Sequence, residues 1–146
     1  IILANTDTYG GGGIYNSYTL TTAHHRDFRP VVVHEFGHSF GGLGDEYFYD
    51  NADDNDNMHS LKHEPWEPNI TTLVDFESKW ADMMPEGVEV PTTVTPERTA
   101  NYTVGLYEGG GYLSKGIYRP TDVCRMRNNT AERFCPIEKV ILHQAR

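Results

Sequence analysis

The stretch of sequence that decides the fold runs from residue 34 to residue 45. It reads His34-Glu35-Phe36-Gly37-His38-Ser39-Phe40-Gly41-Gly42-Leu43-Gly44-Asp45. On a helix, His34 and His38 lie one turn apart on the same face, so both imidazoles can bind one metal ion. Glu35 lies beside that face, where its carboxylate can reach a water molecule on the metal without binding the metal. Two imidazoles, an acidified water and a base are the components of a zinc hydrolase, and the pattern predicts that chemistry.

A zinc site of this kind needs a third protein ligand. In zinc peptidases of the metzincin kind, the helix stops at a glycine, and the third ligand lies three residues beyond that glycine. Gly42 and Asp45 have this spacing, with Asp in place of the usual His, and we predict that Asp45 is the third ligand. Glu46 is the neighbouring alternative, because a one-residue change in the turn would exchange the two. Glu77 is a more distant one, by analogy with the second-helix glutamate of the gluzincin zinc peptidases.

Length and charge restrict the class of protein. A chain of 146 residues is large enough to bury a core, and we predict a single catalytic domain over residues 1–146. The net charge of −9 disfavours nucleic acid and anionic membranes as partners, since both attract basic surfaces. No apolar run approaches the roughly 20 residues that cross a bilayer. The expected partner is therefore a protein or peptide substrate.

The first residues, Ile1 to Ala4, are apolar and include neither an initiator Met nor a basic segment. They do not have the form of an intact signal peptide. We expect a mature or excised piece of a longer protein, with sheet neighbours upstream of residue 1 and further domains in the parent chain.

The two cysteines, Cys124 and Cys135, are separated by ten residues. A disulfide between them would close a short loop and stabilise the fold by about 2–3 kcal/mol. Free buried thiols and a metal-binding pair are the alternatives, but neither Cys-x-x-Cys spacing nor a nearby His supports a second zinc site. The disulfide is favoured, and it predicts a secreted or otherwise extracytoplasmic location, including the bacterial cell surface and the periplasm.

The pattern of apolar residues predicts an α+β fold. Residues 1–4 are expected to form a buried strand, and residues 14–23 alternate as a half-buried strand does. If the second of these strands lies at a sheet edge beside the metal-binding helix, its free backbone groups can pair with an extended peptide. An ordinary strand inside a sheet fits the pattern equally well.

Helices are predicted in three places. Pro30 fits the first turn of the metal-binding helix. An apolar stripe on that helix is expected to face the core, and its members are Val33, Phe36, Gly37 and Phe40. Residues 72–83 have near-helical apolar spacing and predict a second helix. Pro136 begins a final helix, whose predicted inner face consists of Ile137, Val140 and Ile141.

Three blocks of sequence carry a resemblance to a known family. The first runs from His34 through Asp45 to Glu46 and Tyr47. The second begins with Tyr107-Glu108-Gly109-Gly110-Gly111-Tyr112, continues with Gly116-Ile117-Tyr118-Arg119-Pro120 and ends with Cys124-Arg125-Met126-Arg127. The third is Phe134-Cys135-Pro136. Together they resemble the bacterial immunoglobulin-A-type metallopeptidase family, which belongs to the metzincin zinc peptidases.

The resemblance implies a zincin-like (metzincin) catalytic domain with a small twisted sheet, an active-site helix and a C-terminal helix. It also implies that Met126 lies in a tight turn beneath the metal ligands without binding the metal. Many metzincins have a Tyr two residues after that Met to help hold the reacting oxyanion. Asn128 stands there in this chain, so this helper is absent or comes from elsewhere, and Tyr47, Tyr112 and Tyr118 are the candidates.

The predicted function is that of a zinc-dependent endopeptidase acting on an extracellular protein. Zn²⁺ bound by His34, His38 and Asp45 would lower the pKa of its water to about 7, and Glu35 would act as the general base. The alternative is a non-catalytic binding module on the same scaffold, with zinc structural or lost. Zinc hydrolysis of a non-peptide amide is a third interpretation.

Overall fold

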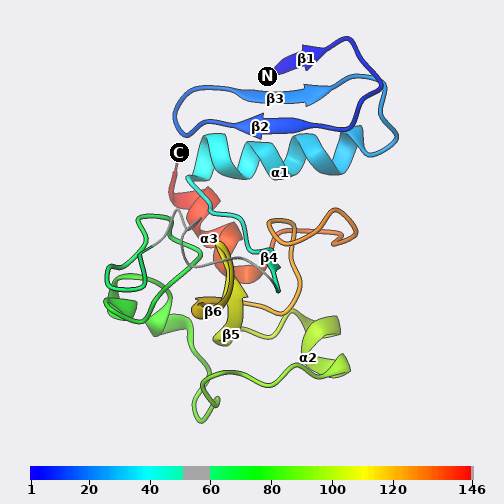
Figure 1. Cartoon of the computed structure of the whole chain (residues 1–146). Helices are drawn as coiled ribbons and strands as arrows, with labels where there is room; N and C mark the ends of the chain where they lie inside the picture. Colours follow the sequence, from blue (N-terminus) through cyan, green and yellow to red (C-terminus); the bar gives the residue numbers. More distant parts are fainter. Residues whose placement is uncertain (51–59, 146) are drawn as a thin grey trace.

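The structure is a computed structural model that describes residues 1–50 and 60–145. Its described elements are two small sheets, three α-helices and two short 3₁₀ turns, an α+β arrangement (Figure 1). The first sheet lies on one side of helix α1, and helix α3 and the second sheet lie on the other (Figure 1). Within the described ranges, no helix is both long enough and apolar enough to cross a membrane.

The first sheet has the order β1-β3-β2. Strand β3 (Thr19–Thr22) pairs in parallel with β1 (Ile2–Ala4) and antiparallel with β2 (Gly11–Gly13). Of the two interpretations of the 14–23 segment, a strand inside a sheet is confirmed and a sheet edge is not, because β3 is central, and the strand covers only residues 19–22. The edge beside α1 belongs instead to the glycine strand β2.

Strand β1 is confirmed as a strand, but the prediction that it is buried is wrong. Ile1, Ile2 and Leu3 are 76%, 49% and 56% exposed. The strand lies at the outer edge of the sheet, on the side of β3 opposite β2. Within the part of the chain that the structure describes, the apolar composition of β1 is therefore not a sign of a buried strand.

Helix α1 (Phe28–Gly41) has Pro30 in its first turn, and a left-handed glycine, Gly42, follows its last residue. Gly42 has φ 64°, and its N–H donates to the carbonyl of His38, while the N–H of Leu43 donates to Gly37. Glycine adopts this conformation without the steric cost of a Cβ. The predicted stop at the glycines is thus confirmed, with Gly41 inside the helix and Gly42 as its cap.

The buried face of α1 differs from the predicted apolar stripe. Three members of that stripe are 36–40% exposed, namely Val33, Phe36 and Phe40. The buried residues of the helix are Val31, Gly37 and Gly41. Small residues mark this face because a Cβ at Gly37 would lie 2.6 Å from Met126 Sδ, and one at Gly41 would lie 2.7 Å from Leu142 Cδ2.

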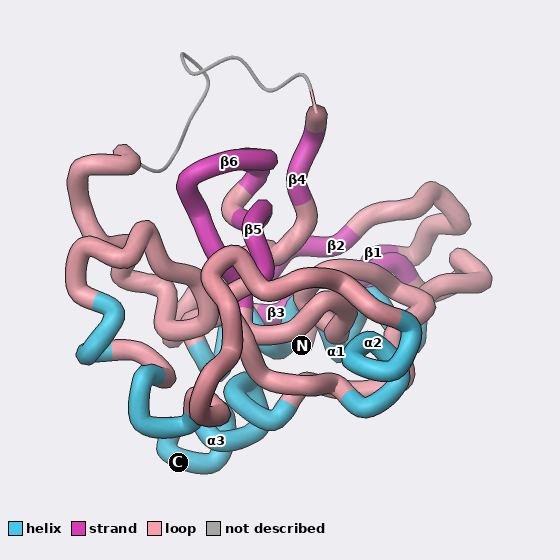
Figure 2. The backbone as a smooth tube through the Cα atoms, turned by 90° about the horizontal axis from the view of Figure 1, so that it is seen from below, coloured by secondary structure: helices cyan, strands magenta, loops and turns pink. Residues whose placement is uncertain are grey.

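The second sheet has the order β4-β6-β5, and Figure 2 shows its three strands near one another. Strand β4 (Phe48–Tyr49) pairs in parallel with β6 (Tyr112–Arg119), and β5 (Tyr107–Gly110) pairs with β6 in the antiparallel sense. The N–H of Gly111, in the turn between β5 and β6, donates to the carbonyl of Asp45. This sheet therefore holds the segment that follows α1.

The predicted helix over 72–83 is wrong. This segment contains two separate 3₁₀ turns, η2 (Phe76–Ser78) and η3 (Ala81–Met83), and Leu73 has a positive φ of 67°. A left-handed residue at the start and the break at Lys79, where ψ is −115°, prevent a continuous helix. Trp80 is nevertheless buried. The apolar spacing over 72–83 therefore indicated packing in the core and not a helix.

The remaining helices are α2 (Pro96–Asn101) and α3 (Pro136–Gln144), and the second confirms the predicted final helix. Cys135 and Glu138 form a capping box at its start. Ile137 is buried as predicted, whereas Val140 is 38% exposed. The main apolar cluster, against which α3 packs, consists of Leu43, Trp80, Leu106, Cys124, Met126, Cys135 and Ile137.

The expected disulfide is wrong, because Cys124 and Cys135 are free, buried thiols. Cys124 Sγ lies 2.7 Å from Glu46 Oε2 and 3.1 Å from Glu138 Oε1. Both glutamates are completely buried, and this burial raises the pKa of each carboxyl well above its ordinary value of 4.5. The cluster is a neutral hydrogen-bonded network in the core.

The raised pKa of Glu138 predicts a dependence of stability on pH. A carboxyl whose folded-state pKa exceeds its unfolded value contributes most below the unfolded pKa, and that contribution is lost as the pH rises. We expect the free energy of unfolding of the wild type to fall relative to Glu138→Gln between about pH 5 and about pH 8. Urea denaturation of both proteins across this range measures the difference. A constant difference would contradict the prediction.

The close contact between β2 and α1 yields a second stability prediction. A Cβ at Gly13 would lie 2.2 Å from the backbone oxygen of Glu35, whereas a Cβ at Gly12 would meet nothing within 4 Å. We expect Gly13→Ala to destabilise the protein by about 2–3 kcal/mol, because backbone cannot move aside. Gly12→Ala is the matched control and should stay within about 0.5 kcal/mol of the wild type. Thermal and urea unfolding test this, and equal effects would refute it.

Candidate metal centre

Helix α1 presents three potential ligand groups on one side. Single side-chain donor atoms of His34, Glu35 and His38 all lie within 4.8 Å of one another. The two imidazole Nε2 atoms are 3.1 Å apart. One helical turn of spacing has therefore brought the two rings together as the sequence predicted.

The turn after the helix brings Asp45 to the same point. Asp45 Oδ1 lies 3.0 Å from His34 Nε2 and 3.2 Å from His38 Nε2. Ligands of a tetrahedral zinc ion, each about 2.0 Å from the metal, are about 3.3 Å from one another. The three atoms form a triangle close to that size, so the residues present fit a small divalent cation.

The outer nitrogen of each imidazole is held by a backbone carbonyl. His34 Nδ1 lies 3.1 Å from the carbonyl of Arg125, and His38 Nδ1 lies 2.5 Å from that of Leu43. A carbonyl oxygen only accepts hydrogen bonds, so each Nδ1 carries a hydrogen. In the neutral ring, Nε2 then offers its lone pair, as a metal ligand requires.

The carboxylate of Asp45 is divided between two environments. Oδ2 accepts a hydrogen bond from the hydroxyl of Tyr112, whereas the buried Oδ1 has no hydrogen-bond partner among the described residues. Burial alone would raise the pKa of Asp45, but contacts with His34, His38 and Tyr112 outweigh it and lower that pKa. A buried acceptor without a donor costs about 1–3 kcal/mol, which a bound cation would offset.

Protons and a cation would compete at His38. Burial disfavours the charged imidazole, but the carboxylate of Asp45 outweighs burial and raises the pKa of His38. Binding of a cation at Nε2 must therefore release or exclude a proton there.

Glu35 lies beside the triangle rather than within it. Burial raises the pKa of its carboxyl, and the neighbouring imidazoles of His34 and His38 reduce the shift. A Cβ at Gly11 would lie 2.7 Å from Glu35 Oε1, so strand β2 confines this carboxylate. The carboxylate is placed to exchange a proton with a group bound at the triangle.

The two alternative third ligands do not join the triangle. Glu46 turns into the core, where Oε1 accepts from Asn69 Nδ2 at 2.9 Å and Oε2 lies beside Cys124. Glu77 is exposed on η2, and among the residues that the structure describes no hydrogen bond or ion pair joins it to His34 or His38. The geometry therefore favours Asp45.

Met126 lies beneath α1, completely buried. Its carbonyl accepts from the N–H of Glu46 at 3.0 Å, and its sulfur lies against Gly37 on the helix. The preceding carbonyl, that of Arg125, is the one that holds His34. This segment thus supports both the helix and the turn that carries Asp45.

The candidate tyrosines have different surroundings. Tyr47 stacks near His34, with ring centroids 6.5 Å apart, and Tyr112 is engaged with Asp45. Burial and the charge of Asp45 raise the pKa of Tyr47, so its hydroxyl remains a donor. Tyr118 is in β6, packed against the core and paired with Thr71. Tyr47 is therefore the best placed of the three to reach a bound substrate.

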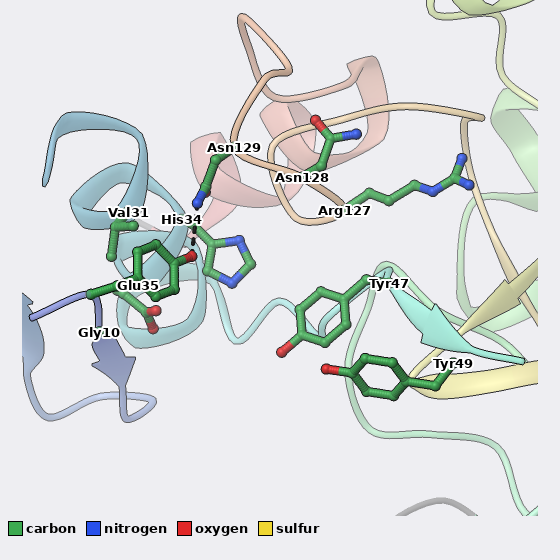
Figure 3. Close-up of a pocket in the computed structure, with 11 residues that line it drawn as sticks. Gly10, Val31, His34, Glu35, Tyr47, Tyr49, Arg127, Asn128 and Asn129 are labelled. Atoms are coloured by element: carbon green, nitrogen blue, oxygen red, sulfur yellow. Dashed lines mark hydrogen bonds between the residues drawn. The ribbon is translucent and has the colours of Figure 1, made fainter. Parts of the chain in front are cut away.

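The cleft over the triangle consists of two hollows, of 460 and 390 Å³, that share Gly11, His34, Glu35 and Tyr47. Figure 3 shows the larger one, with the hydroxyls of Tyr47 and Tyr49 pointing toward the side that bears His34 and Glu35. In the lining of this hollow, Asn129 donates to the hydroxyl of Tyr9 at 2.9 Å. A peptide could cross the cleft from one hollow to the other.

Several of these residues escaped sequence reasoning. The carbonyls of Leu43 and Arg125 leave no signal in a sequence, because any residue has a carbonyl. Tyr112 was a candidate for the oxyanion, but its hydroxyl holds Asp45. Trp66 lines the smaller hollow, and only its position between two prolines sets it apart in the sequence.

A comparison with protein families finds a match for this chain. The model of a family described as IgA Peptidase M64 matches residues 1–101, a range that includes the first sheet, α1 and Asp45. The later blocks of sequence resemblance, from residue 107 onward, lie outside the matched range. A search of the curated proteins finds no match.

Proposed function

The chain belongs to the IgA Peptidase M64 family, and on that premise we propose that it is a zinc-dependent endopeptidase of the metzincin kind. The metal ligands in this proposal are His34, His38 and Asp45, and the general base is Glu35. The observation that carries the proposal is the triangle of two Nε2 atoms and one carboxylate oxygen, with edges of 3.0–3.2 Å. The left-handed cap at Gly42 and the buried Met126 agree with it.

In the proposed hydrolysis, each residue of the site has a separate role. A divalent cation at the triangle would supply Lewis acidity, lowering the pKa of a water molecule and polarising the scissile carbonyl. Glu35 takes the proton of the attacking water on its carboxylate and then gives it to the leaving amine. A carboxyl whose pKa is raised by burial is suited to both transfers. The hydroxyl of Tyr47 is the proposed donor to the developing oxyanion.

The edge of β2 is the proposed binding surface for the peptide backbone. Gly11, Gly12 and Gly13 line the cleft, and β2 is the edge strand of its sheet beside α1. An extended peptide can add to such an edge through its own backbone groups. The substrate is then a protein or peptide. Because both cysteines are free, they do not support an extracytoplasmic location. We propose that location only from the nature of the substrate, an extracellular protein.

The decisive experiment combines metal analysis with a cleavage assay on a mixed peptide library. Glu35→Gln should reduce cleavage about 10²–10⁴-fold, because a general base is lost, while one zinc per chain is retained. Asp45→Ala should lose the zinc, and Glu77→Ala is the control that should keep both zinc and activity. Full activity of Glu35→Gln would favour the non-catalytic binding module. Loss of zinc in Glu77→Ala alone would refute the ligand assignment.

A second prediction concerns the hydroxyl that holds Asp45. Tyr112→Phe removes the donor to Oδ2 and frees the carboxylate to rotate, so we expect zinc affinity to fall about 10- to 100-fold. Tyr49→Phe removes a hydroxyl from the same aromatic group, where Tyr49 stacks on Tyr112 with centroids 6.5 Å apart, and serves as the control. Competition with a chelator measures the affinity. Equal affinities for Tyr112→Phe and the wild type would contradict the assigned role.

A further inference from the structure

Trp66 is a large apolar side chain that is exposed to solvent and not buried. It is 65% exposed, although Pro65 and Glu67 on either side of it are buried. It lines the same 390 Å³ hollow as His38 and Asp45. An exposed Trp inside a cleft is typical of a residue that contacts a binding partner.

The backbone that carries Trp66 is held by a buried lysine. Lys79 Nζ donates to the carbonyl of Pro65 at 2.5 Å and to that of Glu67 at 2.9 Å. The Lys79 side chain is only 5% exposed, and burial lowers the pKa of its ammonium group. Burying an ammonium group is costly, and here the group fixes the two carbonyls that flank Trp66. The indole is therefore presented on a rigid turn.

The indole also rests on the turn that forms the candidate metal centre. The rings of Trp66 and Tyr15 are in contact, with centroids 5.6 Å apart and an interplanar angle of 40°. A Cβ at Gly42 would lie 3.0 Å from Trp66 Cζ3 and 3.2 Å from Tyr15 Cε2. Both rings thus pack on the glycine that ends α1, three residues before Asp45. Their position relative to the triangle is set by that turn.

The other end of the cleft has a different chemistry. The larger hollow is lined by Arg127, Asn128 and Asn129, and Tyr9 there is hydrogen-bonded to Asn129. Arg127 pairs with Asp122 at 2.6 Å. Exposed tyrosines also line this hollow, Tyr9 at 57% and Tyr49 at 59%, but of the two hollows only the smaller one is lined by an indole, that of Trp66. A peptide that crosses the triangle therefore meets the largest apolar ring on one side alone.

We propose that Trp66 and Tyr15 form a specificity site that selects peptide substrates with an aromatic side chain on one side of the scissile bond. This inference rests on the proposed function and adds the class of substrate to it. An aromatic ring can stack on the exposed indole and bury apolar area on both surfaces, whereas a small or charged side chain gains little there. Trp66 and Tyr15 determine specificity and touch the substrate without taking part in proton transfer.

Cleavage of matched peptides tests the specificity. Peptides that differ only by Phe or Ala at successive positions are incubated with the zinc-loaded wild type, and the cleavage sites are mapped. We expect Phe to raise kcat/KM about 10- to 100-fold at a position on one side of the bond, and Trp66→Ala to abolish that preference. Tyr18→Ala, which changes a 39% exposed aromatic outside both hollows, should keep it. A preference that survives in Trp66→Ala would overturn the inference.

A binding measurement separates this inference from the proposed function. The chain has two tryptophans, and Trp80 is 1% exposed, so quenching by acrylamide reports mainly on Trp66. In Glu35→Gln protein, a Phe peptide of the series should reduce this quenching, and its Ala counterpart should not. If the wild type cleaves no peptide but the Phe peptide still protects Trp66 from acrylamide, the result supports the specificity site and the peptidase proposal fails. Equal quenching with both peptides overturns the site, whether or not the wild type cleaves.

Discussion

The left-handed turn at Gly42 is the constraint on which the rest of the structure depends. It ends α1 and reverses the chain so that Asp45 Oδ1 reaches both imidazoles, within 3.0 and 3.2 Å of their Nε2 atoms. A side chain at this position would suffer from the positive φ and would also meet Trp66 and Tyr15. One glycine therefore fixes the helix end, the third proposed ligand and the aromatic end of the cleft.

The charges around this turn are arranged so that one carboxylate faces the two imidazoles. Asp45 is kept ionised by its contacts, whereas Glu46, the next residue, turns into the core and joins a neutral network with Cys124 and Asn69. The outer imidazole nitrogens meet carbonyls, which carry no formal charge. Once a cation has replaced any proton at Nε2, two imidazoles and one anion leave net positive charge to act on a substrate.

The sequence was most informative where chemistry requires particular residues at particular spacings. The positions of His34, His38 and Asp45 followed from one helical turn and one glycine bend, and the structure brings the three together. Apolar patterns were less informative about packing. Phe36 and Phe40 have helical spacing, but the buried face belongs to glycines that admit close neighbours. The spacing over 72–83 marked buried Trp80 but could not reveal the left-handed backbone at Leu73 that breaks the helix.

Glycines also explain how a short edge strand can serve the proposed cleft. Gly11 and Gly13 allow β2 to approach α1 so closely that a Cβ at either would clash with Glu35. This contact orders a strand whose composition favours disorder when free. It also brings the free backbone edge of β2 within the same hollow as the imidazoles. A bulkier strand would have to lie farther from the helix, and a peptide paired with it would then lie farther from Glu35. The glycine run is therefore a requirement of the site, although its composition alone suggests a flexible loop.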